Sequence, residues 1–592
     1  MSAPLIGIDL GTTHSLCSVF REGRPELIPN ATGHRLTPSV VGVIDDQIVV
    51  GAAAVELRVT RPERTASMFK RWMGTDREIP LGERTFSAPE LSSLVLRSLK
   101  RDAEVTLGTE VRRAVITVPA YFNDHQRKAT KLAGELAGLE VQRIINEPTA
   151  AALTYGFHDR ATDKRFLVFD LGGGTFDVTL MEVFEGTLEI IATSGESQLG
   201  GEDFTDRLAA FVLKQHGLSF EQVEFRELAR LSRLRAECER AKRALSGEGH
   251  PSSTVRLPGP DGRLDPSSPT IAIDLEIVAA QTSDLLERLE RPVFRALADA
   301  EWNASDLDEV ILVGGATRLP LVADLVRRRL GVDPLCRFDP DHVVALGAAV
   351  QAALIADDRS VDDMVMTDVC PFTLGVETTK QLGTRFRDGY YLPVIHRNTT
   401  IPVSREEVVG TLVENQSEMR LRVFQGEGRR VQDNLLLGEL QVTGIPPGPI
   451  GTEVHVRFTY DLNGILEVEA LIPTTGRRFH TVLLQHVKGL SESEIRRAVS
   501  KLQELKFYPR DELRNQRLLR FAERAVGEIN PFQREELDHA VDQFERAMAQ
   551  SDRGRFEESR ESLLVTLSRL GFDFDDGPVD DASDGVAADD SE

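Results

Sequence analysis

The chain has 592 residues, of which 41% are hydrophobic and 28% charged, and these values fit an ordinary soluble protein with three to four domains. A formal net charge of −24 argues against nucleic acid or an anionic membrane as the main partner. The sequence has no apolar stretch of about 18 residues, so no membrane span is expected. The start of the chain shows no signal peptide pattern. The four cysteines lack metal-binding spacing and are expected to be free thiols in a reducing cytoplasm.

One pattern occurs twice in the first part of the chain: an apolar strand ends in an aspartate and is followed by a glycine turn with hydroxyl residues. The copies are residues 8–13 and 169–177, and their first aspartates, Asp9 and Asp170, are 161 positions apart. Glycine lets the backbone approach phosphate oxygens closely enough for its N–H groups to donate hydrogen bonds. A nucleoside triphosphate held by two such turns would lie in a cleft between two lobes, which predicts an ATP-dependent protein.

Three carboxylates are expected to cluster where the two turns meet, because Asp9, Asp170 and Asp177 all lie at strand ends beside the glycines. Close carboxylates repel one another unless a cation lies between them, so the pattern predicts Mg²⁺ bound to the phosphates. Mg²⁺ commonly keeps its waters, and these residues would then hold it largely through water. The alternative, in which the aspartates merely end strands, explains one of them more easily than all three.

Residues 1–362 alternate β-rich runs with helical patterns, which indicates an α/β architecture. Strands are expected at residues 114–118, 166–169, 188–192 and 310–313. Helices are expected at residues 88–102, 125–137 and 228–245.

The pattern changes after residue 362. A short segment at 363–368 places apolar residues between aspartates, which suggests a linker that docks in one state and is released in another. Residues 369–490 show short alternating strands, for example at 453–460, and this is typical of an all-β sandwich. From Ser491, which begins a capping-box pattern with Glu494, the chain becomes helical. Residues 573–592 contain nine acidic and no basic residues, as in a solubilising tail.

Seven motifs carry a resemblance to a known family. They lie at residues 8–13, 118–124, 145–152, 169–177, 199–204, 239–246 and 313–318. On these motifs the chain resembles the DnaK-type molecular chaperones of the heat shock protein 70 family, and it looks closest to the HscC branch. The match covers residues 5 to about 490 and is looser in the helical end.

The resemblance implies a multidomain fold. It begins with an actin-like α/β ATPase of two lobes (1–362) and an interdomain linker (363–368). A β-sandwich peptide-binding domain (369–490), an α-helical lid (491–570) and an acidic tail (571–592) follow.

The resemblance also implies an activity, that of an ATP-dependent chaperone for extended hydrophobic segments of client proteins. ATP binding would open the peptide site and ATP hydrolysis would close it. The implied cofactors are ATP, ADP and Mg²⁺, with K⁺ as a further candidate. The implied partners are unfolded or partly folded clients and a J-domain co-chaperone, with a nucleotide-exchange factor as a further candidate. We expect a cytoplasmic monomer that serves protein folding and the stress response.

The family's catalytic and nucleotide-binding roles transfer to matching positions. The implied catalytic residues are Lys70, Glu147, Asp170, Thr175, Asp177 and Asp9. Asp9, Glu147, Asp170 and Asp177 would also hold Mg²⁺, largely through water. The implied nucleotide-binding residues are Gly11, Thr12, Thr13, Gly172, Gly173, Gly174, Thr175, Gly200, Gly201, Glu239, Lys242, Arg243, Ser246, Gly314, Gly315, Arg318 and Asp341. Without the resemblance, Lys70 and the charged face at 239–246 would be taken as solvated surface.

Two further sets of residues are implied outside the nucleotide site. The allosteric set, which connects the nucleotide to the linker, is Pro119, Arg127, Arg143, Asp363 and Asp368. The peptide-binding set is Val376, Thr379, Val409, Leu412, Met419 and Leu421, of which Thr379 and Leu412 would form an arch over the peptide. The alternative for these apolar residues is ordinary sandwich core.

The chain departs from the family pattern at several positions. Thr367 replaces an apolar linker residue, which would weaken docking of the linker. Ala316 lies where many relatives carry a hydroxyl or amide group. A polar Thr379 and a bulky Leu412 make an altered arch, and the following loop, 380–397, is long and basic.

Three other functions share some of these features. A dedicated regulatory binder would use the same ATP switch on one or a few partner proteins. A small-molecule kinase would share the twin phosphate turns, but it would need a carboxylate that activates the acceptor and would have no use for a β-sandwich and a lid. A filament protein of the actin type is disfavoured by the appended domains and the high negative charge.

Overall fold

The computed structural model describes residues 4–44, 47–158, 163–184, 187–247, 250–356, 358, 360–361, 365–382, 385–461, 464–483, 513–526, 529, 531–550, 553–572 and 574 of the chain. These residues divide between two compact units. The first comprises residues 4–372 together with Arg397–Ile401. The second comprises Thr373–His396 and the described residues from Pro402 onward.

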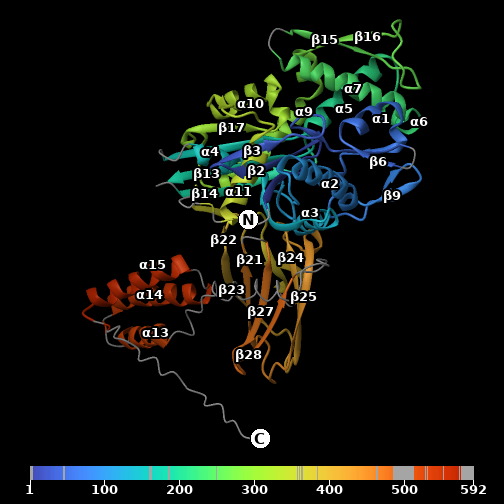
Figure 1. The fold of residues 1–592 in the computed structure, drawn as a ribbon. Helices are drawn as coiled ribbons and strands as arrows, with labels where there is room; N and C mark the ends of the chain where they lie inside the picture. Colours follow the sequence, from blue (N-terminus) through green and yellow to red (C-terminus); the bar gives the residue numbers. More distant parts are fainter. Residues whose placement is uncertain are drawn as a thin grey trace. The chain divides into compact units, whose positions relative to one another are not determined.

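The first unit contains two large mixed sheets built on the same local plan (Figure 1). In the first sheet, β1 (Leu5–Asp9) pairs antiparallel with β2 (His14–Arg21) and parallel with β10 (Arg113–Val118). In the second, β12 (Lys164–Leu171) pairs antiparallel with β13 (Phe176–Phe184) and parallel with β17 (Glu309–Val313). Each hairpin turn therefore lies beside the carboxyl end of a parallel neighbour, and the two glycine patterns occupy equivalent places.

Shorter strands complete these sheets. The first runs β11–β10–β1–β2–β3, with β4 beside β2, and adds β3 (Arg24–Ile28), β4 (Thr37–Pro38) and β11 (Glu140–Asn146). The second runs β18–β17–β12–β13–β14–β19–β22 and adds β14 (Thr187–Glu196), β18 (Pro334–Leu335), β19 (Val365–Val369) and β22 (Thr400–Ile401). The remaining strands of this unit are β5 (Val40–Ile44), β6 (Gln47–Val50), β7 (Thr65–Ser67), β8 (Ile79–Leu81), β9 (Arg84–Phe86), β15 (Ser252–Arg256) and β16 (Thr270–Asp274).

Helices surround both sheets. Local sequence explains where several of them begin: the reciprocal capping box of Ser87 and Glu90 starts α2, and that of Asn123 and Gln126 starts α3. The α-helices of the first unit are α1 (Ala52–Thr60), α2 (Ala88–Leu107), α3 (Asp124–Leu136), α4 (Glu147–His158), α5 (Gly201–Gln215), α6 (Phe220–Arg226), α7 (Leu228–Leu245), α8 (Leu275–Gln281), α9 (Ser283–Asp299), α10 (Pro320–Leu330) and α11 (Val343–Ile355). Short 3₁₀ turns include η2 (Phe69–Trp72) and η4 (Gly315–Arg318).

Three hydrophobic cores organise this unit. One packs α2 and η2 against the first sheet, and we call these elements the first body. Another packs α5, α7, α9 and α10 against the second sheet, and we call these elements the second body. The third core joins the two bodies, because residues of both sheets share it with α4 and α11, including Val115, Val168 and Val350.

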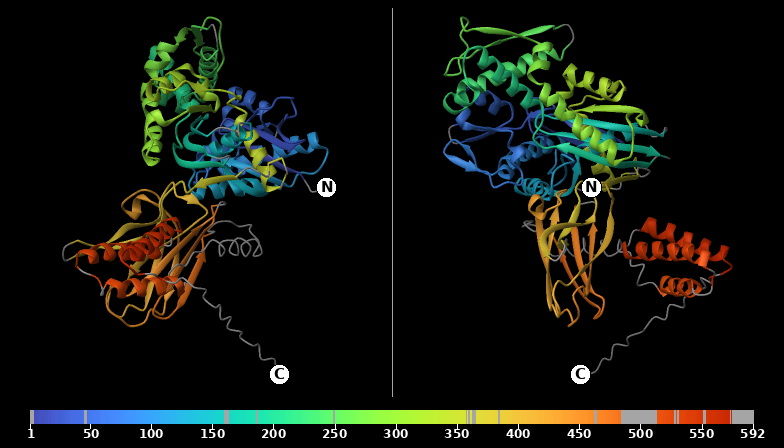
Figure 2. Two further views of the ribbon diagram at one scale, coloured as in Figure 1. Left: turned by 90° about the vertical axis from the view of Figure 1, so that its left-hand side faces the viewer. Right: turned by 180° about the vertical axis from the view of Figure 1, so that it is seen from behind.

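The second unit contains strands of two four-stranded antiparallel sheets and a group of helices (Figure 2). One sheet runs β21–β20–β24–β25 and the other β23–β26–β27–β28. The strands are β20 (Leu374–Leu382), β21 (Arg385–Ile395), β23 (Val403–Gly410), β24 (Glu418–Gln425), β25 (Leu435–Thr443), β26 (Glu453–Tyr460), β27 (Leu466–Ile472) and β28 (Arg477–Val482). The helices are α13 (Leu513–Val526), α14 (Pro531–Gln550) and α15 (Arg553–Arg569).

The predicted strands and helices are confirmed in kind among the described residues, and most differences lie at their ends. The loop expected at 380–397 is wrong, because β20 continues to Leu382 and β21 covers Arg385–Ile395. The strand expected at 188–192 runs Thr187–Glu196, and the helix expected at 88–102 continues to Leu107. The helices after residue 512 share a core that includes Leu518, Phe544 and Leu563, as the apolar spacing predicts. The capping box at Ser491 and linker residues 363 and 364 lie outside the described residues.

The linker segment is where the fold differs most from a simple tether. Residues 365–369 form β19, which pairs in parallel with β14 in the registers Leu188 with Met366 and Glu189 with Thr367. The same strand pairs antiparallel with β22, which returns from the sandwich part of the sequence. The linker is therefore a strand of the second sheet in this structure.

The contact between α4 and α11 gives a stability prediction for the joint core. A Cβ atom at Gly347 would overlap the backbone of Ala150. Neither backbone can move without separating the helices, so Gly347→Ala should reduce the free energy of unfolding by about 3 kcal/mol. Denaturant unfolding followed by fluorescence suits this test, because both tryptophans of the chain, Trp72 and Trp302, lie in the first unit.

The matched control is Gly331→Ala. A Cβ there would meet nothing within 4 Å, and only the positive φ of 71° opposes the substitution. Its cost should be about 1 kcal/mol. Equal losses in the two variants would contradict the packing argument.

Candidate functional site

A cavity of about 680 Å³ opens between the two bodies of the first unit. Its walls hold nearly all residues predicted for ATP: Asp9, Gly11, Thr12, Thr13, Lys70, Glu147, Asp170, Gly172, Gly173, Thr175, Gly201, Glu239, Lys242, Arg243, Ser246, Gly314, Gly315, Arg318 and Asp341. Gly174, Gly200 and Asp177 do not line the cavity but lie directly behind it, in contact with the lining loops. Residues from ten separate places in the sequence thus meet in one volume.

The two glycine turns face each other at close range. A Cβ at Gly173 would lie 2.6 Å from the Thr13 Oγ1 atom, and one at Gly174 would lie 2.6 Å from the Thr12 Cγ2 atom. Only glycine fits at this separation. The backbone N–H groups and hydroxyls of both turns are therefore available to one set of phosphate groups.

Lys70 is a buried cation beside the two glycine turns. It belongs to η2, its residue is 2% exposed, and its Nζ atom lies 2.5 Å from Glu147 Oε1. The ring of Phe122 lies 5.6 Å from the same ammonium group. Glu147 is the first residue of α4, so this ion pair connects the first body to the helix of the joint core.

Three aspartates surround that ion pair. Asp9 accepts a hydrogen bond of 3.1 Å from Thr117, and Asp177 accepts one of 3.0 Å from the backbone N–H of Tyr121. Asp170 lies opposite Asp177 in the β12–β13 register, and its buried Oδ2 atom has no hydrogen-bond partner among the described residues. An unpaired carboxylate oxygen on a residue of the cavity wall is suited to a hydrated cation.

Burial and mutual repulsion disturb the protonation of these groups. Burial, with the negative charge of Glu147, raises the pKa of Asp9 to about 7 and the pKa of Asp177 to about 7. Burial and the charges of Glu147 and Asp177 raise the pKa of Asp170 well above its ordinary value. Such shifts mean that the folded protein retains protons that a bound cation would displace.

The described residues contain no group of three or more His, Cys, Asp or Glu side chains placed to hold a metal ion directly. The three aspartates and Glu147 nevertheless fit Mg²⁺, because this ion keeps several waters and binds through phosphate oxygens. Contact through water requires acceptors of the kind that Asp170 provides.

The opposite end of the cavity is formed by one face of α7. The predicted spacing of Glu239, Lys242, Arg243 and Ser246 places all four in the cavity wall. Lys242 is buried and donates to the Gly201 carbonyl oxygen at 2.6 Å and to the Thr205 hydroxyl at 2.8 Å. Burial acts to raise the pKa of Glu239, but the adjacent Lys242 and Arg243 outweigh it and lower that pKa to about 2. The charged side chains at this end of the cavity therefore form a network of ion pairs and hydrogen bonds.

The residues predicted to carry the signal also form a connected chain. Pro119 begins the turn in which the Tyr121 N–H holds Asp177. Arg127 donates to the Phe122 carbonyl oxygen at 3.0 Å and to the Asn146 side chain. Asn146 in turn donates to Asp368 of β19 at 3.2 and 3.3 Å.

Two other members of the allosteric set are less informative. Arg143 is half-buried in β11, and Asp363 lies outside the described residues. The described part of the set therefore runs from the nucleotide cavity to the linker strand.

The residues predicted to bind a peptide differ in how far they are exposed to solvent. Val376 and Leu421 are buried in the sandwich, at 0% and 2% exposure, which favours the core alternative for both. Met419 and Val409 are half-buried, and Leu412 is 44% exposed.

The remaining peptide position is tied to its own hairpin. Thr379 donates a hydrogen bond of 2.6 Å to Asp388 on the neighbouring strand. Whether these residues bind a peptide stays a prediction.

Some cavity residues were not found from the sequence. His14 directly follows Thr13 and Glu202 of α5 lies within the motif at 199–204, so both were within reach, whereas Arg58 of α1 carries no recognisable local pattern. Burial and the neighbouring Arg243 lower the pKa of His14, and burial raises that of Glu202. These side chains reach the cavity only because distant elements fold together.

The raised carboxyl pKa values give a pH prediction for the nucleotide-free protein. Because the folded-state pKa of Asp177 exceeds its unfolded value, the ionised carboxylate destabilises the fold above about pH 7. That cost falls as the pH is lowered towards 4. Asp177→Asn should therefore stabilise the nucleotide-free protein by about 1–3 kcal/mol at pH 8 and by about half as much or less at pH 5.

The measurement is urea unfolding at both pH values, followed by tryptophan fluorescence, with Asp76→Asn as the exposed control. Asparagine can still accept the Tyr121 hydrogen bond, so the variant isolates the charge. A stabilisation that is equal at pH 5 and pH 8 would contradict the assignment.

No helix among the described residues is long and apolar enough to span a membrane. The model of the family described as Hsp70 protein matches residues 5–80 and 76–563. Proteins named "Chaperone protein DnaK" from Thermotoga petrophila, Thermotoga sp. strain RQ2 and Thermotoga maritima are each 42% identical over 508 residues, covering 84% of this chain and 82% of the relative. The chain therefore belongs to the Hsp70 family.

Proposed function

We propose that the protein is an ATP-dependent molecular chaperone whose ATPase cycle controls the binding of client proteins. The observation that carries this proposal is the meeting of two glycine turns, Lys70 and three carboxylates in one cavity of an Hsp70 family member, with Asp177 directly behind it. The similarity to DnaK proteins supports the chaperone activity and an ATPase that drives it. It does not favour a dedicated regulatory binder. The assignment to the HscC branch stays a prediction.

The chemistry follows from where the charges lie. The phosphates would bind the N–H groups of residues 11–13 and 172–174, and the nucleoside would lie against α7 and η4. Mg²⁺, when bound through the phosphates, would offset their charge, and Asp9, Asp170, Asp177 and Glu147 would hold its waters. Lys70 would stabilise the charge that develops on the transferred phosphoryl group, and Thr175 would position the attacking water.

Glu147 would orient Lys70 through their ion pair, which is short and nearly dry. One of the adjacent carboxylates would accept the proton that the attacking water loses. The site supports slow hydrolysis of the kind that times a conformational cycle.

The domain organisation that we propose is an actin-like ATPase (1–362), a linker (363–368), a β-sandwich that binds extended peptides (369–490), an α-helical lid (491–570) and an acidic tail (571–592). ATP would open the peptide site and hydrolysis would close it. An extended client segment would bind through its backbone and one side-chain pocket. The partners we propose are partly folded clients, a J-domain protein and a nucleotide-exchange factor. We also propose that the protein is a cytoplasmic monomer and that it binds ADP and K⁺.

Coupling would run through β19. Release of this strand from β14 would break the hydrogen bonds between Asp368 and Asn146 and so reach Arg127 and the Tyr121 turn. Because the Tyr121 N–H holds Asp177, the same path ends at a catalytic carboxylate. The linker strand could thus report on the nucleotide and influence its hydrolysis.

The decisive experiment is ATP hydrolysis by the full chain, with and without a peptide that has a hydrophobic core and basic flanks. Lys70→Ala should lower the single-turnover rate by about 100-fold or more, because it removes a buried charge from the transition state. Lys214→Ala, at an exposed position of α5, should leave the rate unchanged. Slow turnover that rises with peptide and is lost in Lys70→Ala supports the chaperone. Turnover that responds to no peptide would overturn a general chaperone activity.

Thr367 gives a separate prediction about the linker. Its hydroxyl oxygen is buried without a hydrogen-bond partner among the described residues. Thr367→Val keeps the shape and removes that unpaired group, so docking of β19 should strengthen by about 1 kcal/mol. Hydrogen exchange of the amides at 365–369 should slow about fivefold. Thr400→Val, at an exposed position of β22, should change exchange little, and faster exchange in Thr367→Val would refute the prediction.

A further inference from the structure

The residue next to the buried lysine points in a different direction and reaches the second body. Arg71 follows Lys70 in η2, and its side chain is 10% exposed. Phe69 and Met73, at 2% and 0% exposure, anchor this turn in the core of the first body. Met68, which precedes the turn, has a positive φ of 58°, so the direction of the turn is defined by its backbone as well. Arg71 is therefore a rigid projection of the first body.

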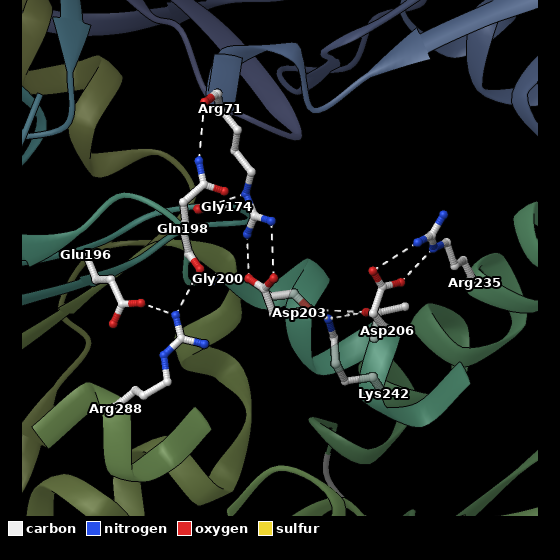
Figure 3. A network of polar contacts seen from close by, with 12 residues as sticks. Arg71, Gly174, Glu196, Gln198, Gly200, Asp203, Asp206, Arg235, Lys242 and Arg288 are labelled. Atoms are coloured by element: carbon white, nitrogen blue, oxygen red, sulfur yellow. Dashed lines mark hydrogen bonds and ion pairs between the residues drawn. The ribbon is translucent and has the colours of Figure 1, made fainter. Parts of the chain in front are cut away.

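Its guanidinium group binds two parts of the second body (Figure 3). The Nε atom donates to the Gly174 carbonyl oxygen at 3.0 Å, and the two terminal nitrogens bind both carboxylate oxygens of Asp203, with Nη1 at 3.1 Å from Oδ1. The Arg71 carbonyl oxygen also accepts a hydrogen bond of 3.3 Å from Gln198. One residue thus contacts the glycine turn after β12 and the start of α5.

Asp203 also stabilises the start of α5, so its contact with Arg71 involves that helix as well. It is the third residue of α5, and its Oδ2 atom accepts the Gly200 N–H at 2.7 Å. Phe204 and Leu208 of the same helix are buried in the core of the second body. The carboxylate therefore fixes the helix start that borders the cavity and binds the first body at the same time.

The loop between β14 and α5 is held from its other side as well. Arg288 of α9 binds the Glu196 carboxylate and donates to the Gln198 carbonyl oxygen at 3.1 Å. Both contacts lie within the second body. Arg71 differs from Arg288 because it links this loop to the other body (Figure 3).

We propose that Arg71 is a positioning residue that clasps the two phosphate turns over bound nucleotide and holds Lys70 at the reacting phosphate. The geometry gives two reasons. Gly174, whose carbonyl oxygen binds Arg71, is the residue that packs on Thr12 of the other turn. Arg71 also shares η2 with Lys70, so loss of the clasp frees the lysine backbone. This inference rests on the proposed ATPase function and adds a residue outside the nucleotide-contacting set.

The clasp should control two rates. Separation of the bodies has to break a largely buried, bidentate ion pair, and removal of one partner leaves the other charge unpaired. Nucleotide release should therefore accelerate about 10-fold or more in Arg71→Ala. The single-turnover rate should fall about 10-fold, because a displacement of about 1 Å at Lys70 is enough to slow the chemistry. Lys70→Ala should show the chemical defect without the faster release.

The test measures dissociation of a fluorescent ATP analogue and single-turnover hydrolysis in the full chain. The variants are Arg71→Ala, Arg71→Lys, Asp203→Asn and the double variant Arg71→Ala with Asp203→Asn. If the clasp exists, the double variant releases nucleotide no faster than either single variant, since each removes the same link. Arg71→Lys keeps the positive charge but loses the bidentate geometry of the guanidinium group. Its rates of nucleotide release and hydrolysis should therefore lie between those of wild type and Arg71→Ala.

Arg207→Ala is the matched control, because Arg207 forms an exposed ion pair with Asp284 inside the second body, at 49% and 53% exposure. It should alter neither rate. Additive effects of the Arg71 and Asp203 substitutions, unchanged release in Arg71→Ala, or equal acceleration in Arg207→Ala would each overturn the clasp. A wild-type chain that binds the analogue but hydrolyses no ATP would instead overturn the proposed ATPase function, and the release experiment would still decide whether the clasp exists.

Discussion

The structure of the first unit depends on buried negative charge around a single ammonium group. Asp9, Asp170, Asp177 and Glu147 converge near Lys70, and burial with mutual repulsion raises the pKa values of the three aspartates. A protein tolerates such an arrangement only where a ligand supplies further positive charge. The energy that the empty arrangement costs is recovered when a cation and its phosphates bind, and this makes the cavity a site for nucleotide instead of a second core.

The same charges are connected to the rest of the molecule by backbone groups. Tyr121 holds Asp177 through its N–H, Glu147 begins the helix that joins both sheets, and Asp203 caps the helix that borders the phosphates. A change in the nucleotide therefore alters contacts of rigid elements and not only of side chains. The linker strand β19 lies at the end of one such path, through Asn146. This arrangement gives a physical basis for coupling between hydrolysis and a distant binding event.

The repetition in the sequence has a structural meaning. Each sheet carries an antiparallel hairpin beside a parallel strand, and each hairpin turn supplies glycine and hydroxyl groups to the same cavity. Two hairpin turns of the same kind that face each other can enclose a phosphate chain more fully than one turn alone. Contacts between the two bodies, such as that of Arg71 with Asp203, then hold the two copies together.

The sequence by itself determined the elements and the two phosphate turns with their aspartates. Glycine turns and strand-ending aspartates are local patterns, because the backbone geometry they require is set by neighbouring residues. The apolar spacing after residue 512 likewise indicated the helices that form a shared core. The resemblance added Lys70, Glu147 and the nucleoside end of the site, including the face at residues 239–246, which the sequence alone would place on the solvated surface.

Only the tertiary structure decided which distant residues meet. The partnership of Arg71 with Asp203 spans 132 positions, Arg58 enters the cavity from a helix without a motif, and residues 365–369 become a strand of a sheet begun about two hundred residues earlier. The burial of Val376 and Leu421 was likewise beyond a local pattern, since a groove residue and a core residue share the same apolar side chain. Such facts depend on how whole sheets and helices pack, and packing is a property of the complete chain that no short stretch of sequence encodes.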